Sequence, residues 1–167
     1  MNRDLLIVGK KILVAKEKRY LKRLNFSENS NCIIELSLNV PGIPKVGPMW
    51  KLVFRLCVKA IEENIPSQLL FSDVNIAGYY AVFNSYISLT ETKIRSCLIE
   101  EEAEWGRLVD IDCFKDNKKI SRKDIGLKER KCMICSNPNS VCIGKHLHSV
   151  EELRKKAEVI CKNLKWR

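Results

Sequence analysis

The segment Gly106-Arg-Leu-Val-Asp-Ile-Asp112 ends in an alternation of apolar and acidic residues. Side chains of an extended strand point alternately to its two sides, so Asp110 and Asp112 share one face, with backbones about 6 to 7 Å apart. Val109 and Ile111 point to the opposite face. The pattern predicts a half-buried strand. Its acidic face is either a solvated surface or a site where two carboxylates hold Mg²⁺ against a phosphate.

Further strands are indicated on both sides of the acidic segment. Residues 34 to 40 alternate in the same way and end at Pro41-Gly42. Two more runs, 69–74 and 79–86, flank a turn at residues 75–78, and we expect another strand at 94–99. These runs supply the predicted sheet.

Three segments have helical periodicity. In the first 26 residues, apolar positions recur between cations at Leu5, Val8, Ile12, Ala15, Leu21 and Leu24. Residues 48–63 begin with proline and place their apolar residues on one face. A last helix starts at the capping box formed by Ser149 and Glu152. The element order predicts an α+β fold, a mixed or antiparallel sheet flanked by helices, with a small Cys/His segment near the C-terminus.

Composition sets the size and class of the protein. The chain has 167 residues, 46% of them apolar, so we expect one domain over residues 1–167 with a core that needs no disulfides. We find no run of 18 uninterrupted apolar residues, and cations interrupt the N-terminal segment, so we expect a cytoplasmic protein without a membrane span or secretory signal. Four of the eight cysteines lie in apolar patterns typical of core residues: Cys32, Cys57, Cys97 and Cys161.

Basic residues are unevenly distributed. The formal net charge is +10, and the excess gathers in residues 1–26 and 107–131. Clustered cations favour a polyanionic partner such as a nucleic acid, a phosphorylated cofactor or an acidic protein. A solvated basic surface is the alternative, and charge alone does not choose between them.

A second candidate site lies at about residues 130–148. Its residues Cys132, Cys135, Cys142 and His148 have the spacing C-x2-C-x6-C-x5-H. Three thiolates and an imidazole can close a tetrahedral Zn²⁺ site. His146 competes with His148 as the fourth ligand, and unliganded thiols or a redox pair are the alternatives.

Cations close to these features are candidates for binding phosphate. The arginine fork binds phosphate oxygens bidentately. Arg107 is favoured because it directly precedes the acidic strand, ahead of Arg122, Arg130 and Lys131. Lys45 ends a proline-rich exit from residues 34–40 that can present backbone N–H groups to an anion.

Several motifs together resemble one family, the citrate lyase holo-acyl-carrier-protein synthases, or apo-citrate lyase phosphoribosyl-dephospho-CoA transferases. They are Leu38-Asn-Val-Pro-Gly-Ile-Pro-Lys45, Gly106-Arg-Leu-Val-Asp-Ile-Asp112, Ile120-Ser-Arg-Lys123, and Arg130-Lys-Cys-Met-Ile-Cys135 through Cys142 and His148. They occur in the family's order, and the resemblance runs over nearly the whole chain, from the basic segment Lys16-Glu-Lys-Arg19 to the C-terminal helix.

The resemblance implies an enzyme that moves the phosphoribosyl-dephospho-CoA group from a triphosphate donor to a serine of the apo acyl-carrier subunit, releasing diphosphate. It also implies a nucleotidyltransferase-like fold and reaction. Mg²⁺ would be held on Asp110 and Asp112, with Arg107 on the diphosphate and Lys45, Arg122, Arg130 and Lys131 as further donor-binding residues. A structural Zn²⁺ at the Cys/His segment is compatible with this function.

The chain departs from the family pattern at one place. Members of the family usually have His-Pro-Leu directly before Gly-Arg-Leu, whereas this sequence has Ala103-Glu104-Trp105. Either that histidine is dispensable, or Glu104 substitutes for it, or activity is weakened.

Two other functions compete with the transferase. A zinc-containing basic module that binds nucleic acid fits the charge, but the aromatic content is 7% and the aromatic residues are not interleaved with cations to form a stacking platform. A thiol oxidoreductase would need a helix N-terminus directly after the Cys-x-x-Cys pair, which the sequence does not predict.

Overall fold

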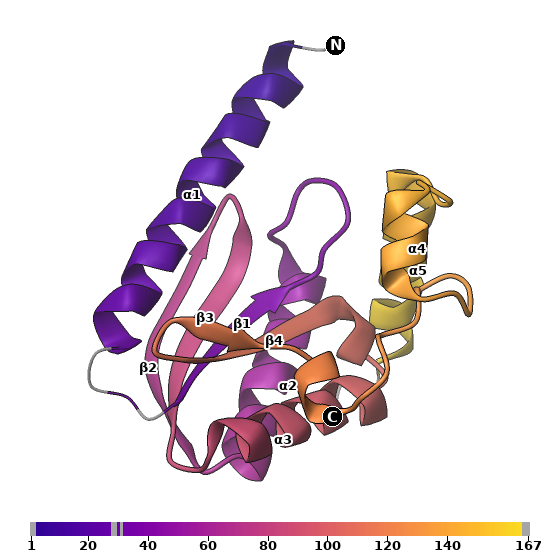
Figure 1. Ribbon diagram of the computed structural model, residues 1–167. Coiled ribbons are helices and arrows are strands. Elements are labelled where there is room, and N and C mark those ends of the chain that lie inside the picture. Colours follow the sequence, from indigo (N-terminus) through magenta and orange to yellow (C-terminus); the bar gives the residue numbers. More distant parts are fainter. Residues whose placement is uncertain (1–2, 28–29, 31, 165–167) are drawn as a thin grey trace.

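The computed structural model describes residues 3–27, 30 and 32–164 (Figure 1). Five antiparallel strands form one sheet in the order β2-β3-β1-β4-β5. The helices are α1 (Arg3–Ser27), α2 (Pro48–Asn64), α3 (Leu89–Glu102), α4 (Asn139–Gly144) and α5 (Val150–Asn163). The strands are β1 (Cys32–Leu38), β2 (Ser67–Asn75), β3 (Gly78–Ser85), β4 (Val109–Lys115) and β5 (Lys118–Ile120), and short 3₁₀ helices occupy Gly106–Leu108 and Lys123–Ile125. The expected α+β class with an antiparallel sheet is confirmed.

Most of the expected elements are present. The alternating runs form β1, the hairpin β2–β3 and β4, and the helix expected from residue 48 is α2. The helix α5 begins at the predicted capping box, in which Ser149 and Glu152 each bond the other's backbone N–H. The four cysteines assigned to the core are all buried.

The prediction of a strand at residues 94–99 is wrong, because this segment lies inside the helix α3. The helix begins at Ser88, whose side chain accepts a hydrogen bond from the Glu91 N–H. Its buried face carries polar residues, among them Lys93, Ser96 and Glu100. These polar residues stand at positions where an amphipathic helix usually has apolar ones. The apolar residues of the segment therefore do not recur at helical spacing, and the sequence did not indicate a helix.

The main core lies between one face of the sheet and α2, α3 and α5. The strand residues Ile34, Leu36, Phe83, Val109 and Ile111 pack there against an apolar face of α2. That face consists of Trp50, Val53, Phe54, Cys57 and Ile61. Each fully buried large apolar side chain contributes roughly 1.5–3 kcal/mol to folding.

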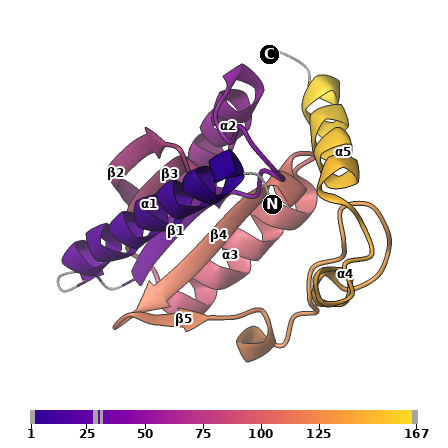
Figure 2. The ribbon, with the colours of Figure 1, turned by 90° about the horizontal axis from the view of Figure 1, so that it is seen from above.

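The opposite face of the sheet is covered by α1, which extends beyond the strands toward its N-terminal end (Figures 1 and 2). Of its predicted apolar stripe, Ala15 is buried and Val8, Ile12 and Leu24 are partly buried, but Leu21 is 53% exposed. The side chain of Leu5 lies outside the described residues. Two buried arginines join the contact with the sheet, so the helix is less regularly amphipathic than the sequence indicated.

Those two arginines have polar partners. The guanidinium of Arg19 donates to the Gly78 carbonyl at 2.7 Å and lies over the ring of Tyr80. Arg23 pairs with Glu35 of β1 at 2.9 Å and lies over the ring of Phe114. A buried cation needs such partners to offset its lost hydration.

The strand β4 has an open edge next to its acidic residues. The short strand β5 pairs only with residues 113–115, and charged side chains bond the rest of the edge. Ile111 donates its N–H to Glu100 at 3.0 Å and accepts from Lys93 at 3.1 Å, and Val109 accepts from Arg130 at 2.8 Å. These contacts satisfy backbone groups that an edge strand otherwise leaves unpaired.

The turn that leads into β4 packs tightly against the end of α3. A Cβ atom at Gly106 would collide with the backbone carbonyl of Glu100. Glycine at this position therefore brings the acidic strand up to the helix that bonds its edge.

We expect Gly106→Ala to lower the free energy of unfolding by about 2 kcal/mol or more, because the added methyl group pushes β4 away from α3. Chemical denaturation monitored by circular dichroism measures this loss. Gly144→Ala is the matched control, since no heavy atom lies within 4 Å of the added Cβ there. Equal stability of the two variants would contradict the tight approach.

Candidate active site and metal centre

The two aspartates of β4 lie on the face of the sheet that α1 partly covers. Both aspartates are partly buried. The residues that alternate with them along the strand, Val109, Ile111 and Cys113, are fully buried in the core. Across the strand pair, Asp110 is opposite Ser37. The alternation predicted from the sequence therefore holds in the structure.

A third carboxylate, that of Glu35, lies opposite Asp112 on the neighbouring strand β1. Burial raises the pKa of Glu35, while the adjacent Arg23 opposes that rise and Asp112 adds to it. Sequence reasoning missed this residue because it considered each strand separately. The only signal was that Glu35 occupies a polar position of an alternating strand.

A cavity of about 510 Å³ opens beside the aspartates. Its wall carries seven charged side chains from other segments, namely Lys93, Glu100, Lys119, Arg122, Lys123, Glu129 and Arg130. Asp112 pairs with Lys119 at 2.7 Å, and Asp110 pairs with Arg130 at 3.0 Å. The structure thus brings the acidic pair together with two of the predicted phosphate-binding arginines.

The protonation of Asp110 is sensitive to its surroundings. About half of its side-chain surface, 49%, is exposed into the cavity. Burial nevertheless raises its pKa, Arg130 opposes this effect, and the charges of Asp112 and Glu100 add to it. A cation bound by Asp110 would favour the ionised form of its carboxylate.

Glu100 organises the cationic wall of the cavity. Its carboxylate is 4% exposed and pairs with Arg122 at 2.7 Å and Arg130 at 3.4 Å, while accepting the Ile111 N–H. Arg122 also pairs with Glu101. Both guanidinium groups are therefore held in fixed positions at the edge of β4.

The remaining predicted cations lie elsewhere. Arg107 and Lys131 line a neighbouring cavity together with Arg122 and Arg130. Burial and the nearby charge of Arg130 lower the pKa of Arg107. Lys45 is absent from the described lining of both cavities, and its ammonium donates to the Val40 carbonyl at 2.6 Å within its own loop.

The structure also defines the position of Ala103-Glu104-Trp105, the segment where the resemblance implies a histidine. Ala103 ends α3 and lines the same cavity as Arg107. Glu104 is exposed and does not appear among the described residues that line the cavity of the aspartates. A replacement of the histidine by Glu104 at that cavity finds no support in this geometry.

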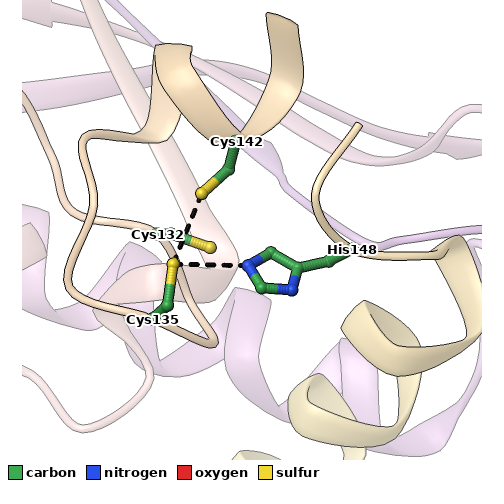
Figure 3. Close-up of side chains that lie close together, drawn as sticks. All are labelled: Cys132, Cys135, Cys142 and His148. Atoms are coloured by element: carbon green, nitrogen blue, oxygen red, sulfur yellow. Dashed lines mark hydrogen bonds between the residues drawn. The ribbon is translucent and has the colours of Figure 1, made fainter. Parts of the chain in front are cut away.

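The four predicted zinc ligands form a compact cluster (Figure 3). The ligand atoms of Cys132, Cys135, Cys142 and His148 all lie within 4.8 Å of one another. Cys135 Sγ is 3.4 Å from Cys142 Sγ and 3.3 Å from His148 Nε2. His146 is exposed and stands outside this set of four.

The cluster fits a soft divalent metal. Hydrogen bonding by His148 lowers the pKa of Cys135 to about 6, which favours the thiolate that a metal binds. Three sulfur donors and one imidazole nitrogen are a common donor set for structural Zn²⁺. The fold gathers these four residues from the turn after Arg130, the helix α4 and the residue before the α5 cap.

The cluster is tied to the cavity of the aspartates through a short backbone segment. Arg130 accepts the Asn139 N–H at 2.9 Å, and Cys132 donates to the Asn137 carbonyl at 2.8 Å. Lys131 forms an isolated bridge with Pro138. The turn that presents the cysteines therefore also fixes the backbone of Arg130.

No helix in the described part of the chain is both long enough and apolar enough to cross a membrane.

Comparison with known proteins agrees with the resemblance of the motifs. Residues 8–164 match the family model described as apo-citrate lyase phosphoribosyl-dephospho-CoA transferase. Two similar relatives are named probable apo-citrate lyase phosphoribosyl-dephospho-CoA transferase. The one from Streptococcus pyogenes serotype M3 is 28% identical over 152 residues, which cover 86% of this chain and 79% of that protein. The one from Vibrio cholerae serotype O1 (strain M66-2) is 27% identical over 164 residues, which cover 93% of this chain and 88% of that protein.

A third relative, protein CitXG of Leuconostoc mesenteroides, is 28% identical over 141 residues, which cover 81% of this chain and 30% of that protein. The family match extends over nearly all of the chain and includes the acidic strand, the cavity beside it and the Cys/His cluster. The chain belongs to the apo-citrate lyase phosphoribosyl-dephospho-CoA transferase family.

Proposed function

We propose that this protein transfers the phosphoribosyl-dephospho-CoA group from its triphosphate donor to a serine of the apo acyl-carrier subunit of citrate lyase. The observation that carries the proposal is the cavity in which Asp110 and Asp112 meet Arg122 and Arg130, in a chain of this family. Carboxylates for a metal and arginines for phosphates are what phosphoryl transfer requires.

In the proposed reaction, the serine oxygen attacks the phosphorus nearest the donor ribose. A new P–O bond to the serine forms, and the bond from this phosphorus to the bridging oxygen of the leaving diphosphate breaks. One carboxylate of the cavity accepts the serine proton. The reaction is of the nucleotidyltransferase type, because an alcohol displaces diphosphate from a phosphorus.

The arginines of the cavity have a defined role in this reaction. Arg122 and Arg130 are held by Glu100 on the wall beside the aspartates, where they can bind the phosphate oxygens of the triphosphate. Arg130 also pairs with Asp110. A phosphate that binds Arg130 would release Asp110 from this pair.

Asp110 and Asp112 would hold Mg²⁺. Their oxygen donors share one strand face beside a cavity with room for phosphates, which suits a hard cation. Bound Mg²⁺ would neutralise charge on the phosphate oxygens. Glu35 lies on the neighbouring strand but is paired with Arg23, so we assign it no role as a metal ligand.

The Cys/His cluster would hold a structural Zn²⁺. All four protein ligands are present, which leaves no open position for a reacting water, as in closed structural sites. The alternative of a basic nucleic-acid-binding module is not favoured, because the family match assigns the chain to transferases. The proposed partners are the apo acyl-carrier subunit and triphosphoribosyl-dephospho-CoA.

We expect Asp110→Asn and Asp112→Asn each to lower the transfer rate by about a hundredfold or more, because each removes a negative ligand from the proposed Mg²⁺ site. Mass spectrometry of the apo carrier subunit, incubated with donor and Mg²⁺, measures the added prosthetic group. The control is Asp73→Asn on β2, which removes a carboxylate outside the described lining of the cavity. Near-normal turnover by both cavity variants would refute the metal role.

We expect Cys135→Ser to release zinc and to lower the melting temperature, because the cluster loses one of its four ligands. Elemental analysis gives the zinc content and differential scanning calorimetry gives the melting temperature. Cys161→Ala is the control: this buried cysteine lies in the core outside the cluster, so the variant should keep its zinc. Zinc-free wild-type protein would show that the four residues are only a set of thiols.

A further inference from the structure

A second cavity of about 460 Å³ lies next to the cavity of the aspartates. The two share Glu100, Arg122 and Arg130 as part of their walls. Arg107, Lys128 and Lys131 line only the second one, which we call the Arg107 cavity. Its volume lies within the range of about 300–1,000 Å³ that is usual for small-ligand sites.

The cations specific to the Arg107 cavity are not held in ion pairs, although the charges of Glu100 and Asp110 act on Arg107 from nearby. Among the described residues, no ion pair or hydrogen bond engages the side chains of Arg107, Lys128 or Lys131. The Nε atom of Arg107 is buried without a hydrogen-bond acceptor. A buried donor without an acceptor costs about 1–3 kcal/mol, so this group is suited to a ligand that supplies acceptor oxygens.

The carboxylates of this cavity are already engaged. Glu100 pairs with Arg122 and Arg130, and Glu101 pairs with Arg122. Glu129 accepts hydrogen bonds from the backbone and hydroxyl of Ser140. The wall carries five cations and three carboxylates, so its net charge is positive and it favours an anion.

The donor in the proposed function carries two separate phosphate groups. One is the triphosphate on the added ribose, and the other is the diphosphate that joins adenosine to the pantetheine arm. Two adjoining cavities with cationic side chains match this arrangement, and a single extended ligand can cross the shared wall at Arg122 and Arg130.

We propose that the Arg107 cavity binds the diphosphate of the donor's dephospho-CoA part, while the cavity of the aspartates takes the triphosphate. This inference rests on the proposed function and identifies which part of the donor each cavity recognises. On this assignment, Arg107 binds the diphosphate that joins adenosine to the pantetheine arm, and it does not bind the diphosphate that leaves in the reaction.

Calorimetric titrations of the full chain with two probes test the assignment. Dephospho-CoA carries only the diphosphate, and inorganic tripolyphosphate with Mg²⁺ stands in for the triphosphate. We expect Arg107→Ala to weaken dephospho-CoA binding by about tenfold or more, because a bidentate charged contact is lost, and to change tripolyphosphate binding by less than about twofold. Asp110→Asn should show the reverse selectivity.

Two further variants guard against effects on folding. Lys128→Ala removes an exposed cation of the same cavity and should weaken dephospho-CoA binding by about two- to fivefold without affecting the fold. Arg95→Ala is the matched control, because Arg95 pairs with Glu91 and lines a different cavity. It should bind both probes as the wild type does.

The assignment is overturned if Arg107→Ala and Lys128→Ala bind dephospho-CoA as the wild type does. It is also overturned if Arg107→Ala weakens the binding of tripolyphosphate as much as the binding of dephospho-CoA. The Arg107 cavity would then hold the triphosphate or the leaving diphosphate. Failure of the proposed function is recognised separately: the wild-type protein would transfer no group to the apo carrier subunit, whatever the titrations show.

Discussion

The carboxylate of Glu100 is the point on which the fold and the candidate active site both depend. It is buried at the end of α3, accepts the N–H of Ile111 from the open edge of β4, and pairs with Arg122 and Arg130. Removing one partner from such a buried charged group typically costs about 3–5 kcal/mol, because the other charges stay buried without compensation. The same contacts that close the edge of the sheet therefore hold two arginines beside the aspartates. Gly106 makes this possible, since only a residue without a Cβ lets the backbone of the strand approach α3 so closely.

Arg130 connects this centre to the Cys/His cluster. Its guanidinium contacts Asp110 and Glu100, while its backbone carbonyl accepts a hydrogen bond from Asn139 beyond the cysteine turn. Cys132 lies only two residues further along the chain. A metal that cross-links the cluster would thus restrict the backbone from which Arg130 reaches the cavity. In the proposed function, a structural zinc would in this way support phosphate binding without touching a phosphate.

The sequence predicted those features that depend on local periodicity or on short motifs. Alternation identified β1 and β4 and placed Asp110 and Asp112 on one face, and ligand spacing identified the four residues of the Cys/His cluster. It failed at α3, because Lys93, Ser96 and Glu100 occupy the buried face where apolar residues would have revealed the helix. Glu35 and the separation of Arg107 from the aspartates depend on strand register and on packing between distant segments. No local pattern encodes those two features.

The cations that form no ion pair indicate where the positive charge of the chain can act on a ligand. Arg122 and Arg130 are neutralised in part by Glu100, Glu101 and Asp110, so in the proposed function they would supply a fixed hydrogen-bonding geometry more than free charge. Arg107, Lys128 and Lys131 form no ion pair among the described residues and add positive charge next to that fixed pair. A net charge of +10 by itself is compatible with a solvated surface. Unpaired cations that surround a cavity, one of them with a buried and unsatisfied donor, favour a bound polyanion instead.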